Sequence, residues 1–154
     1  MNGRAQEAVI NRQRAVRIAL APLRSFLKKV CQGLQLPSSE VTVCFVTDVE
    51  IARLNENFRR KRGPTDVLSF PSHRQQSRRR GKMSPELTRF YLGDIAISPA
   101  TARRNAAKYG RTLPAELRIL MLHGVLHLIG YDHETDHGQM TRLENKLRRR
   151  FGLA

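Results

Sequence analysis

Apolar residues along the chain recur at two different periods, which predict helices in some segments and strands in others. Helical spacing near residues 16–33 predicts a helix that begins at or just before Pro22, because proline fits best in the first turn. The run 41–47 is β-branched and almost wholly apolar, which predicts a strand buried on both faces. Three other segments are also expected to be extended: residues 8–13, residues 65–70, which Pro71 would stop, and residues 92–98.

Capping residues and apolar periodicity predict further helices between and after these strands. The first expected helix follows an Asp48 N-cap and continues through residue 58, and the second runs from Pro99, after a Ser98 cap, to about Tyr109. The third runs from near Pro114, with Glu116 in its first turn, to Gly130, and the last from about His137 to Arg150. Strands that alternate with helices predict a single α/β (α+β) domain over residues 1–154, with a mixed β-sheet of about four strands and surrounding helices.

Length, cysteine content and hydropathy indicate the cellular compartment and whether the chain needs disulfides or a membrane. A chain of 154 residues can bury a core without disulfides, and its two cysteines, Cys31 and Cys44, lack CxxC spacing, so we expect thiols in a reducing compartment. No apolar run reaches the roughly 18–20 residues that cross a bilayer, and the N-terminal segment has no continuous apolar stretch. We therefore expect no membrane partner and a bacterial cytoplasmic location, with a mitochondrial transit peptide as the alternative.

The charge of the chain points to a polyanionic partner. Its formal net charge is +15, and most of its basic residues are arginines, whose planar guanidinium matches phosphate oxygens. The alternative is a solvated surface in an organism with arginine-rich proteins. A polar and basic stretch over residues 72–90, which contains Arg78, Arg79 and Arg80, is expected to be a long exposed loop.

The segment "HGVLHLIGYDH", residues 123–133, carries the chemistry. His123 and His127 lie four residues apart, so both side chains leave one face of the predicted central helix. Gly130 can take a positive φ that reverses the chain and brings His133 back over that face. Three imidazoles with a fourth position open describe a catalytic zinc site on the helix and the following turn. The alternative, hydrogen-bonded core histidines, explains one or two of them better than three.

Two further histidines and one glycine refine this hypothesis. His137 is an outer-shell group, an alternative ligand or a surface residue, and His73 is expected to be solvated. Gly124 stands where HExxH metalloproteases carry a glutamate that acts as general base. Peptide hydrolysis therefore lacks its expected base, whereas phosphodiester cleavage depends less on one, because a metal ion can polarise a phosphoryl oxygen and supply hydroxide.

These residues also carry a resemblance to a known family. "HGVLHLIGYDH" resembles the HGxLHLxGYDH signature of the YbeY family of metal-dependent endoribonucleases. "LNENFRRKRGPTDVLSFP" (54–71) is similar to that family's LNxxYRxxxxPTDVLSFP segment, and "LGDIAIS" (92–98) to its second block. "MTRLE" (140–144) falls where members place a methionine and a glutamate. Together the matches span residues 41 to 144.

The resemblance implies a single-domain mixed α/β fold and a specific set of functional residues. It implies one Zn²⁺ per chain on His123, His127 and His133, with Arg59 as the catalytic arginine that faces the metal cleft. The activity implied is single-strand-specific cleavage of ribosomal RNA precursors, notably at the 3′ end of the small-subunit RNA, and a part in ribosome quality control. The partners implied are the ribosomal small subunit or its associated and assembly proteins. We expect five further arginines to hold the RNA backbone: Arg60, Arg62, Arg78, Arg79 and Arg80. The basic loop 72–90 departs from the more acidic, variable sequence of relatives.

The sequence is compatible with more than one role for several polar neighbours of the histidines. Asp132 and Glu134 flank a ligand and could orient imidazoles, take a proton or stabilise the turn, and Asp66 and Ser69 could line the cleft. Two rival functions remain. One is a metalloprotease-like hydrolase that uses another carboxylate as base; the other is a non-catalytic, zinc-containing RNA-binding factor of ribosome assembly.

Overall fold

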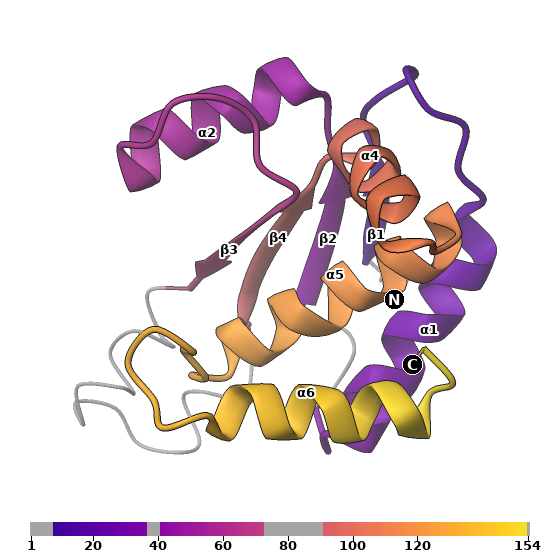
Figure 1. Cartoon of the computed structure of the whole chain (residues 1–154), viewed down its shortest axis with the longest axis vertical. Coiled ribbons are helices and arrows are strands. Elements are labelled where there is room, and N and C mark those ends of the chain that lie inside the picture. The colour runs from indigo at the N-terminus through magenta and orange to yellow at the C-terminus, as the bar shows by residue number, and fades with distance from the viewer. Residues whose placement is uncertain (1–7, 37–40, 73–90, 154) are drawn as a thin grey trace, which may run out of the picture.

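A four-stranded sheet lies at the centre of the fold and is surrounded by helices (Figure 1). The computed structural model describes residues 8–36, 41–72 and 91–153. The elements in chain order are β1 (Val9–Asn11), α1 (Leu20–Gly33), β2 (Val41–Phe45), α2 (Asp48–Arg59), β3 (Val67–Pro71), β4 (Gly93–Ile97), α4 (Pro99–Tyr109), α5 (Leu113–Leu128) and α6 (Gln139–Arg150). The predicted mixed α/β fold with about four strands is confirmed.

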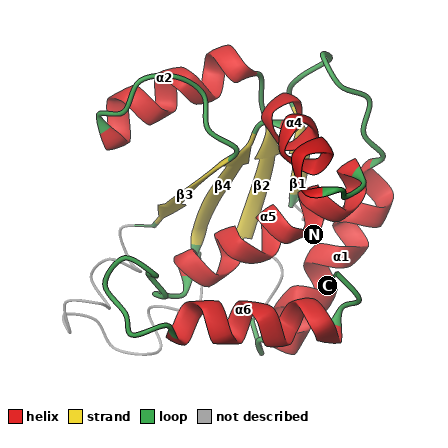
Figure 2. Cartoon of the chain, viewed as in Figure 1, coloured by secondary structure: helices red, strands yellow, loops and turns green. Residues whose placement is uncertain are grey.

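The strand order β1-β2-β4-β3 combines parallel and antiparallel pairing (Figure 2). β1, β2 and β4 run parallel, so the chain must cross over between them, and α1 supplies the crossover from β1 to β2. β3 pairs antiparallel with β4 at one edge, with Ser69 opposite Ile95. β3 therefore lies at the free edge of the sheet, next to the helix that carries the histidine motif.

The two faces of the sheet are buried to different extents. Val43, Phe45 and Ile95 join the main core with α1, α5 and α6, whereas Cys44 faces a smaller apolar cluster with Ile51 of α2. β2 accordingly alternates between buried and half-buried positions. The prediction that residues 41–47 are buried on both faces is therefore wrong, because α2 forms a smaller cluster on the second face than α1 and α5 form on the first.

Several helix boundaries also differ from the predictions. Thr47, not Asp48, caps α2: its Oγ1 accepts the backbone N–H of Glu50 at 3.1 Å. Asp48 lies in the first turn, where its carboxylate accepts hydrogen bonds from α4 and its cap instead. α5 ends at Leu128 rather than at Gly130, and α6 begins at Gln139.

Other predicted boundaries agree with the structure more closely. α1 begins at Leu20, just before Pro22, and Ser98 caps α4 by accepting the N–H of Thr101 at 3.2 Å. Pro71 does not stop β3 before it; it is the last residue of that strand. Cys31 and Cys44 are not joined by a disulfide. Among the described residues, no helix combines the length and apolarity needed to cross a membrane.

The predicted basic loop falls mostly in a part of the chain that the structure does not describe. Arg78, Arg79, Arg80 and His73 lie there, outside the described residues.

Candidate metal centre

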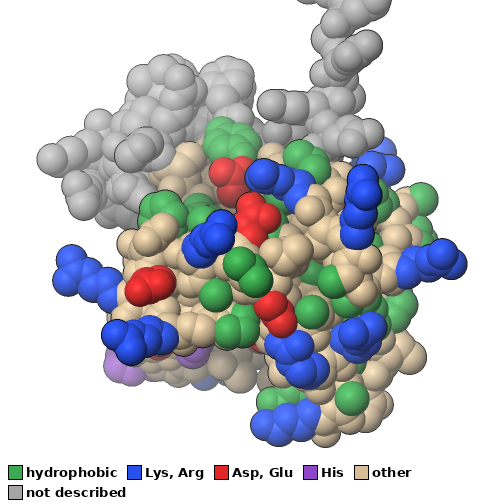
Figure 3. Space-filling model, turned by 90° about the horizontal axis from the view of Figure 1, so that it is seen from above, with side chains coloured by type: hydrophobic (Ala, Val, Ile, Leu, Met, Phe, Trp, Pro, Cys, Tyr) green, Lys and Arg blue, Asp and Glu red, His purple; other side chains and the backbone are tan. Residues whose placement is uncertain are grey.

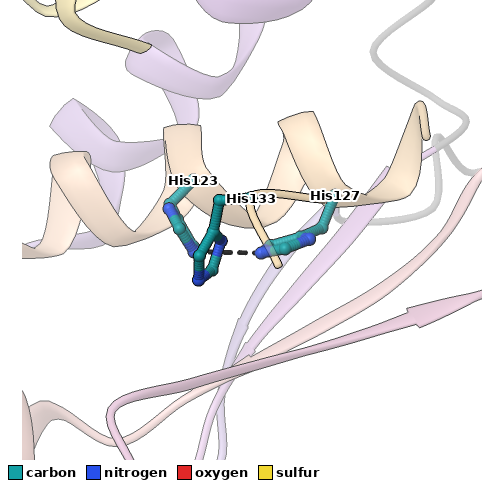
Figure 4. A group of neighbouring side chains, drawn as sticks. All are labelled: His123, His127 and His133. Atoms are coloured by element: carbon teal, nitrogen blue, oxygen red, sulfur yellow. Dashed lines mark hydrogen bonds between the residues drawn. The ribbon is translucent and has the colours of Figure 1, made fainter. Parts of the chain in front are cut away.

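Three imidazole rings converge at the C-terminal part of α5 (Figure 4). His123 and His127 leave the same side of the helix, and His133 comes from the turn that follows. The Nε2 atoms of His123 and His127 are 3.1 Å apart, and one nitrogen from each of the three rings lies within 4.8 Å of the others. The histidines that the sequence grouped together are thus brought together, and they could hold a metal ion.

The turn after α5 places the third ring. Gly130 adopts φ 109°, a region that favours glycine, and the N–H of Tyr131 donates back to the carbonyl of Leu126 at 3.1 Å. Asp132 then closes the turn, because its carboxylate accepts the backbone N–H of Glu134 at 3.0 Å. This reversal brings His133 to within 5.5 Å of His127, measured between ring centroids.

The donor atoms fit a divalent cation that favours nitrogen ligands. Two ligands about 2.0–2.1 Å from one tetrahedral ion are roughly 3.3–3.4 Å apart, close to the 3.1 Å between the Nε2 atoms of His123 and His127. Burial, together with the neighbouring His123 and His133, lowers the pKa of His127. His127 is therefore neutral at pH 7 and keeps a lone pair for a cation.

Glu144 reaches this centre from α6, the helix that follows the turn. Its Oε1 lies 3.0 Å from Nδ1 of His123, and both side chains are largely buried. When Nδ1 donates its proton to this carboxylate, Nε2 of His123 is left with its lone pair directed at the other two rings. Sequence reasoning noted Glu144 only as part of a family match and gave it no role, because 21 residues separate it from His123.

The three histidines line one wall of a cleft of about 750 Å³. The end of α2 and the loop after it form a second wall, which includes Phe58, Arg59 and Lys61, and β3 forms a third. Arg59 therefore shares the cleft with the histidines. Arg60 and Arg62 are exposed but are not among the residues that line it.

The remaining polar candidates take different positions. Asp66 lines the cleft, but its carboxylate accepts hydrogen bonds from the backbone N–H of Val67 and from Asn105, which is a structural use. Ser69 also lines the cleft and donates to the carbonyl of Gly124 at 3.1 Å, which ties β3 to α5. Glu134 lines the cleft and is exposed. His137 is exposed and outside the three-histidine group.

Gly124 faces the sheet and not the cleft. A Cβ atom at this position would lie 2.8 Å from Cγ2 of Ile95, a fully buried residue of β4. A glutamate cannot occupy this space without displacing β4 or α5. The close packing of α5 on the sheet therefore requires a residue without a side chain at position 124. A glutamate that acts as general base, as in the proteases, has no room there.

The chain is similar to several known proteins. The family model described as "Endoribonuclease YbeY" matches residues 7–152. The chain is 48% identical to an endoribonuclease YbeY of Solibacter usitatus over 69% of its own length, a match that spans 62% of that relative. It is 35% identical to that of Geobacter metallireducens over 95% of this chain and 93% of the relative. The solution structure of TM1509 from Thermotoga maritima is similar with a TM-score of 0.57 and 27% identity, covering 94% of this chain and 88% of that one.

Proposed function

This chain belongs to the endoribonuclease YbeY family, and from that premise we propose that it is a zinc-dependent endoribonuclease that cuts single-stranded segments of ribosomal RNA precursors. We further propose that it acts in the cytoplasm on the 3′ end of the small-subunit RNA and in ribosome quality control, together with the small subunit or its assembly proteins. The observation that supports this most directly is that Arg59 and the three-histidine group line one cleft.

Zinc is the metal that the donor set favours. His123, His127 and His133 supply three imidazole nitrogens, the pattern of a catalytic zinc site with one position open, although nickel and copper also accept such ligands. A metal ion held there supplies Lewis-acid polarisation of a phosphoryl oxygen and lowers the pKa of a bound water. The chain's own part is to fix the three rings, through α5, the Gly130 turn and Glu144.

We propose that Arg59 binds the phosphate that is attacked or its neighbour. It lies in the last turn of α2, is exposed, and takes part in no ion pair within the described residues. A guanidinium can donate two parallel hydrogen bonds to phosphate oxygens, and in the cleft it would offset negative charge that builds up on phosphorus. We assign Arg59 the catalytic role and the histidines the metal.

The rest of the basic surface would hold the RNA backbone without reading its sequence. Lys and Arg side chains are scattered over the face seen from above and project from it (Figure 3). Arg60 and Arg62 are exposed and are the chain neighbours of Arg59 and Lys61, which line the cleft, so they could continue these backbone contacts beyond it. Contacts of this kind release counterions, so RNA affinity should fall steeply as the salt concentration rises. We propose the same contacts with the RNA backbone for Arg78, Arg79 and Arg80.

The test compares one ligand variant with a matched histidine variant. His127→Ala should abolish both zinc retention and cleavage of a single-stranded oligoribonucleotide, whereas His137→Ala, which removes an exposed histidine outside the group, should keep both. Zinc is measured by elemental analysis of protein purified without a metal-binding tag. Full cleavage by His127→Ala would contradict the proposal and point to a contaminating ribonuclease.

Two other results would favour the rival functions. Zinc retention and RNA binding without turnover would indicate a non-catalytic assembly factor. Hydrolysis of peptides without cleavage of RNA would indicate a protease, which the packing of Gly124 against Ile95 already disfavours.

A further inference from the structure

Phe58 exposes its ring at the rim of the cleft. It lies in the last turn of α2, the residue is 66% exposed, and it lines the same cleft as Arg59 and the histidines. A single exposed apolar residue is ordinary on a protein surface. An aromatic ring beside a candidate active site that handles a nucleic acid is less ordinary, because such a ring can bind a base.

The ring of Phe58 is held from one side by the sheet. Its centroid lies 5.1 Å from that of Phe70 on β3, at an interplanar angle of 71°, so the two rings meet edge to face. Phe70 packs in turn against the smaller apolar cluster under α2. The loop after α2 is also fixed, because the side-chain amide of the buried Asn55 donates to the carbonyl of Gly63 at 3.0 Å. A ring fixed in this way loses little freedom when a ligand stacks on it.

A run of four cations follows Phe58 directly. Arg59, Arg60, Lys61 and Arg62 are all exposed, and none forms an ion pair with any of the residues that the structure describes. Arg60 adopts φ 55° and ψ 31° at the C-cap of α2, a left-handed position that favours glycine. An arginine in that position accepts backbone strain while adding a positive charge to the run that follows Phe58.

We propose that Phe58 is a stacking platform for one unpaired RNA base, next to the phosphate that the cleft holds. This inference rests on the proposed function and assigns its preference for single strands to one residue. In a duplex each base is already stacked between its neighbours and cannot lie on the ring without being pulled out. In a single strand a base can lie on Phe58 while Arg59 and its neighbours bind the adjoining phosphates. The geometry thus favours unpaired RNA without favouring any one base.

Tyr109 provides a matched control on the same protein. It is also an aromatic residue at the end of a helix, the residue is 57% exposed, and it too has basic neighbours. Cationic groups of Lys108 and Arg111 lie 5.6 and 5.1 Å from its ring centroid, and it is not among the residues that line the cleft. Replacing it changes the aromatic surface by a similar amount without touching the site.

The experiment measures binding of zinc-loaded protein to two single-stranded decamers. One is a 2′-O-methylated decamer, checked on a gel for integrity after each titration, and the other is the same backbone without its bases. Phe58→Ala and Phe58→Leu should raise the Kd for the first decamer about 5- to 150-fold, the range for loss of one stacked base, and leave the Kd for the second unchanged. Tyr109→Ala should change neither. Phe58→Leu keeps an apolar contact for Phe70, so its thermal midpoint separates lost stacking from lost folding.

A third substitution gives a direct signal from the ring position. The chain contains no tryptophan, so Phe58→Trp introduces the only indole. We expect it to bind at least as tightly as the parent protein and its fluorescence to be quenched by the decamer with bases and not by the one without. Unchanged Kd values for Phe58→Ala and Phe58→Leu, or an equal loss on both decamers, would overturn the stacking role. A parent protein that neither binds nor cuts RNA would instead overturn the proposed function, and the inference with it.

Discussion

Glu144 allows the metal centre to be tested without removing any of the three histidines. Its carboxylate accepts a hydrogen bond from Nδ1 of His123 at 3.0 Å, and the side chains of Glu144 and His123 are only 16% and 25% exposed. If this contact orients His123, replacing Glu144 should weaken metal binding while the ligand set stays complete. Glu144→Gln keeps an oxygen that can accept the bond but loses the charge, and Glu144→Ala loses both.

The expected loss follows from the type of contact. Removing an outer-shell partner of a metal-binding histidine weakens metal affinity about 10- to 100-fold. We expect about 10-fold for Glu144→Gln and about 100-fold for Glu144→Ala, or about 1.4 and 2.7 kcal/mol. The larger value lies in the range of about 1.5–3 kcal/mol for a hydrogen bond to a charged group.

The assay is competition for zinc between the protein and a chromophoric chelator. Glu56→Gln, which removes an equal charge from an exposed position on α2 outside the cleft, should leave zinc affinity unchanged. The thermal midpoint of metal-free protein shows whether α6 still packs on α5. Zinc affinities of both Glu144 variants equal to that of the parent would refute the positioning role, and so would equal losses in Glu56→Gln.

Three further predictions concern catalysis and stability. Arg59→Ala should lower kcat about 10²- to 10³-fold with zinc content unchanged, and Arg59→Lys should recover only part of the lost activity. Steady-state cleavage of an oligoribonucleotide measures both, and an unchanged kcat would rule out the catalytic role. Gly124→Ala should lower the urea midpoint. Overpacking against Ile95 costs about 1–3 kcal/mol and the gain in helix propensity is about 1 kcal/mol, which leaves a net loss of up to about 2 kcal/mol; a raised midpoint would contradict the close packing. Burial acts to raise the pKa of Asp48, but hydrogen bonds from α4 and its cap outweigh it and hold this pKa below its ordinary value of 3.8. The ionised carboxylate therefore stabilises the fold above about pH 4, and this contribution is lost as pH falls through the lower folded-state pKa. Asp48→Asn should lower the free energy of unfolding at pH 7 by about 1–2 kcal/mol and flatten its decline below pH 4, and equal slopes in parent and variant would refute the assignment.

The features that the sequence predicts well are those set by neighbours in the chain. The spacing of His123 and His127, one helical turn apart, and the glycine turn before His133 determine where the rings point, so the three-histidine group could be predicted. Ser98 followed by Pro99 likewise marks the start of α4 correctly. In each case residues within one or two turns of backbone determine the feature.

The features that it predicts poorly depend on contacts between distant segments. Glu144 meets His123 only because α6 packs on α5, and no local pattern near residue 144 contains that contact. Asp48 is a good capping residue by type, yet Thr47 takes the cap because Asp48 is engaged by α4. The half-buried second face of β2 depends on how much of the sheet α2 covers.

The packing of α5 on the sheet also explains how this site differs from a zinc protease that shares its histidine spacing. The positions of His123 and His127 face the cleft, and the position between them at Gly124 faces β4, where Ile95 leaves no room for a side chain. Ser69 of β3 donates to the Gly124 carbonyl and brings the edge strand close to the helix at the same point. A carboxylate forced into this contact would be buried among apolar atoms, where an unpaired charge is strongly disfavoured. The close packing of α5 on the sheet therefore leaves no room for the protease base. The histidines instead share their cleft with Arg59, so the site is suited to a substrate that brings negative charge with it rather than to a peptide.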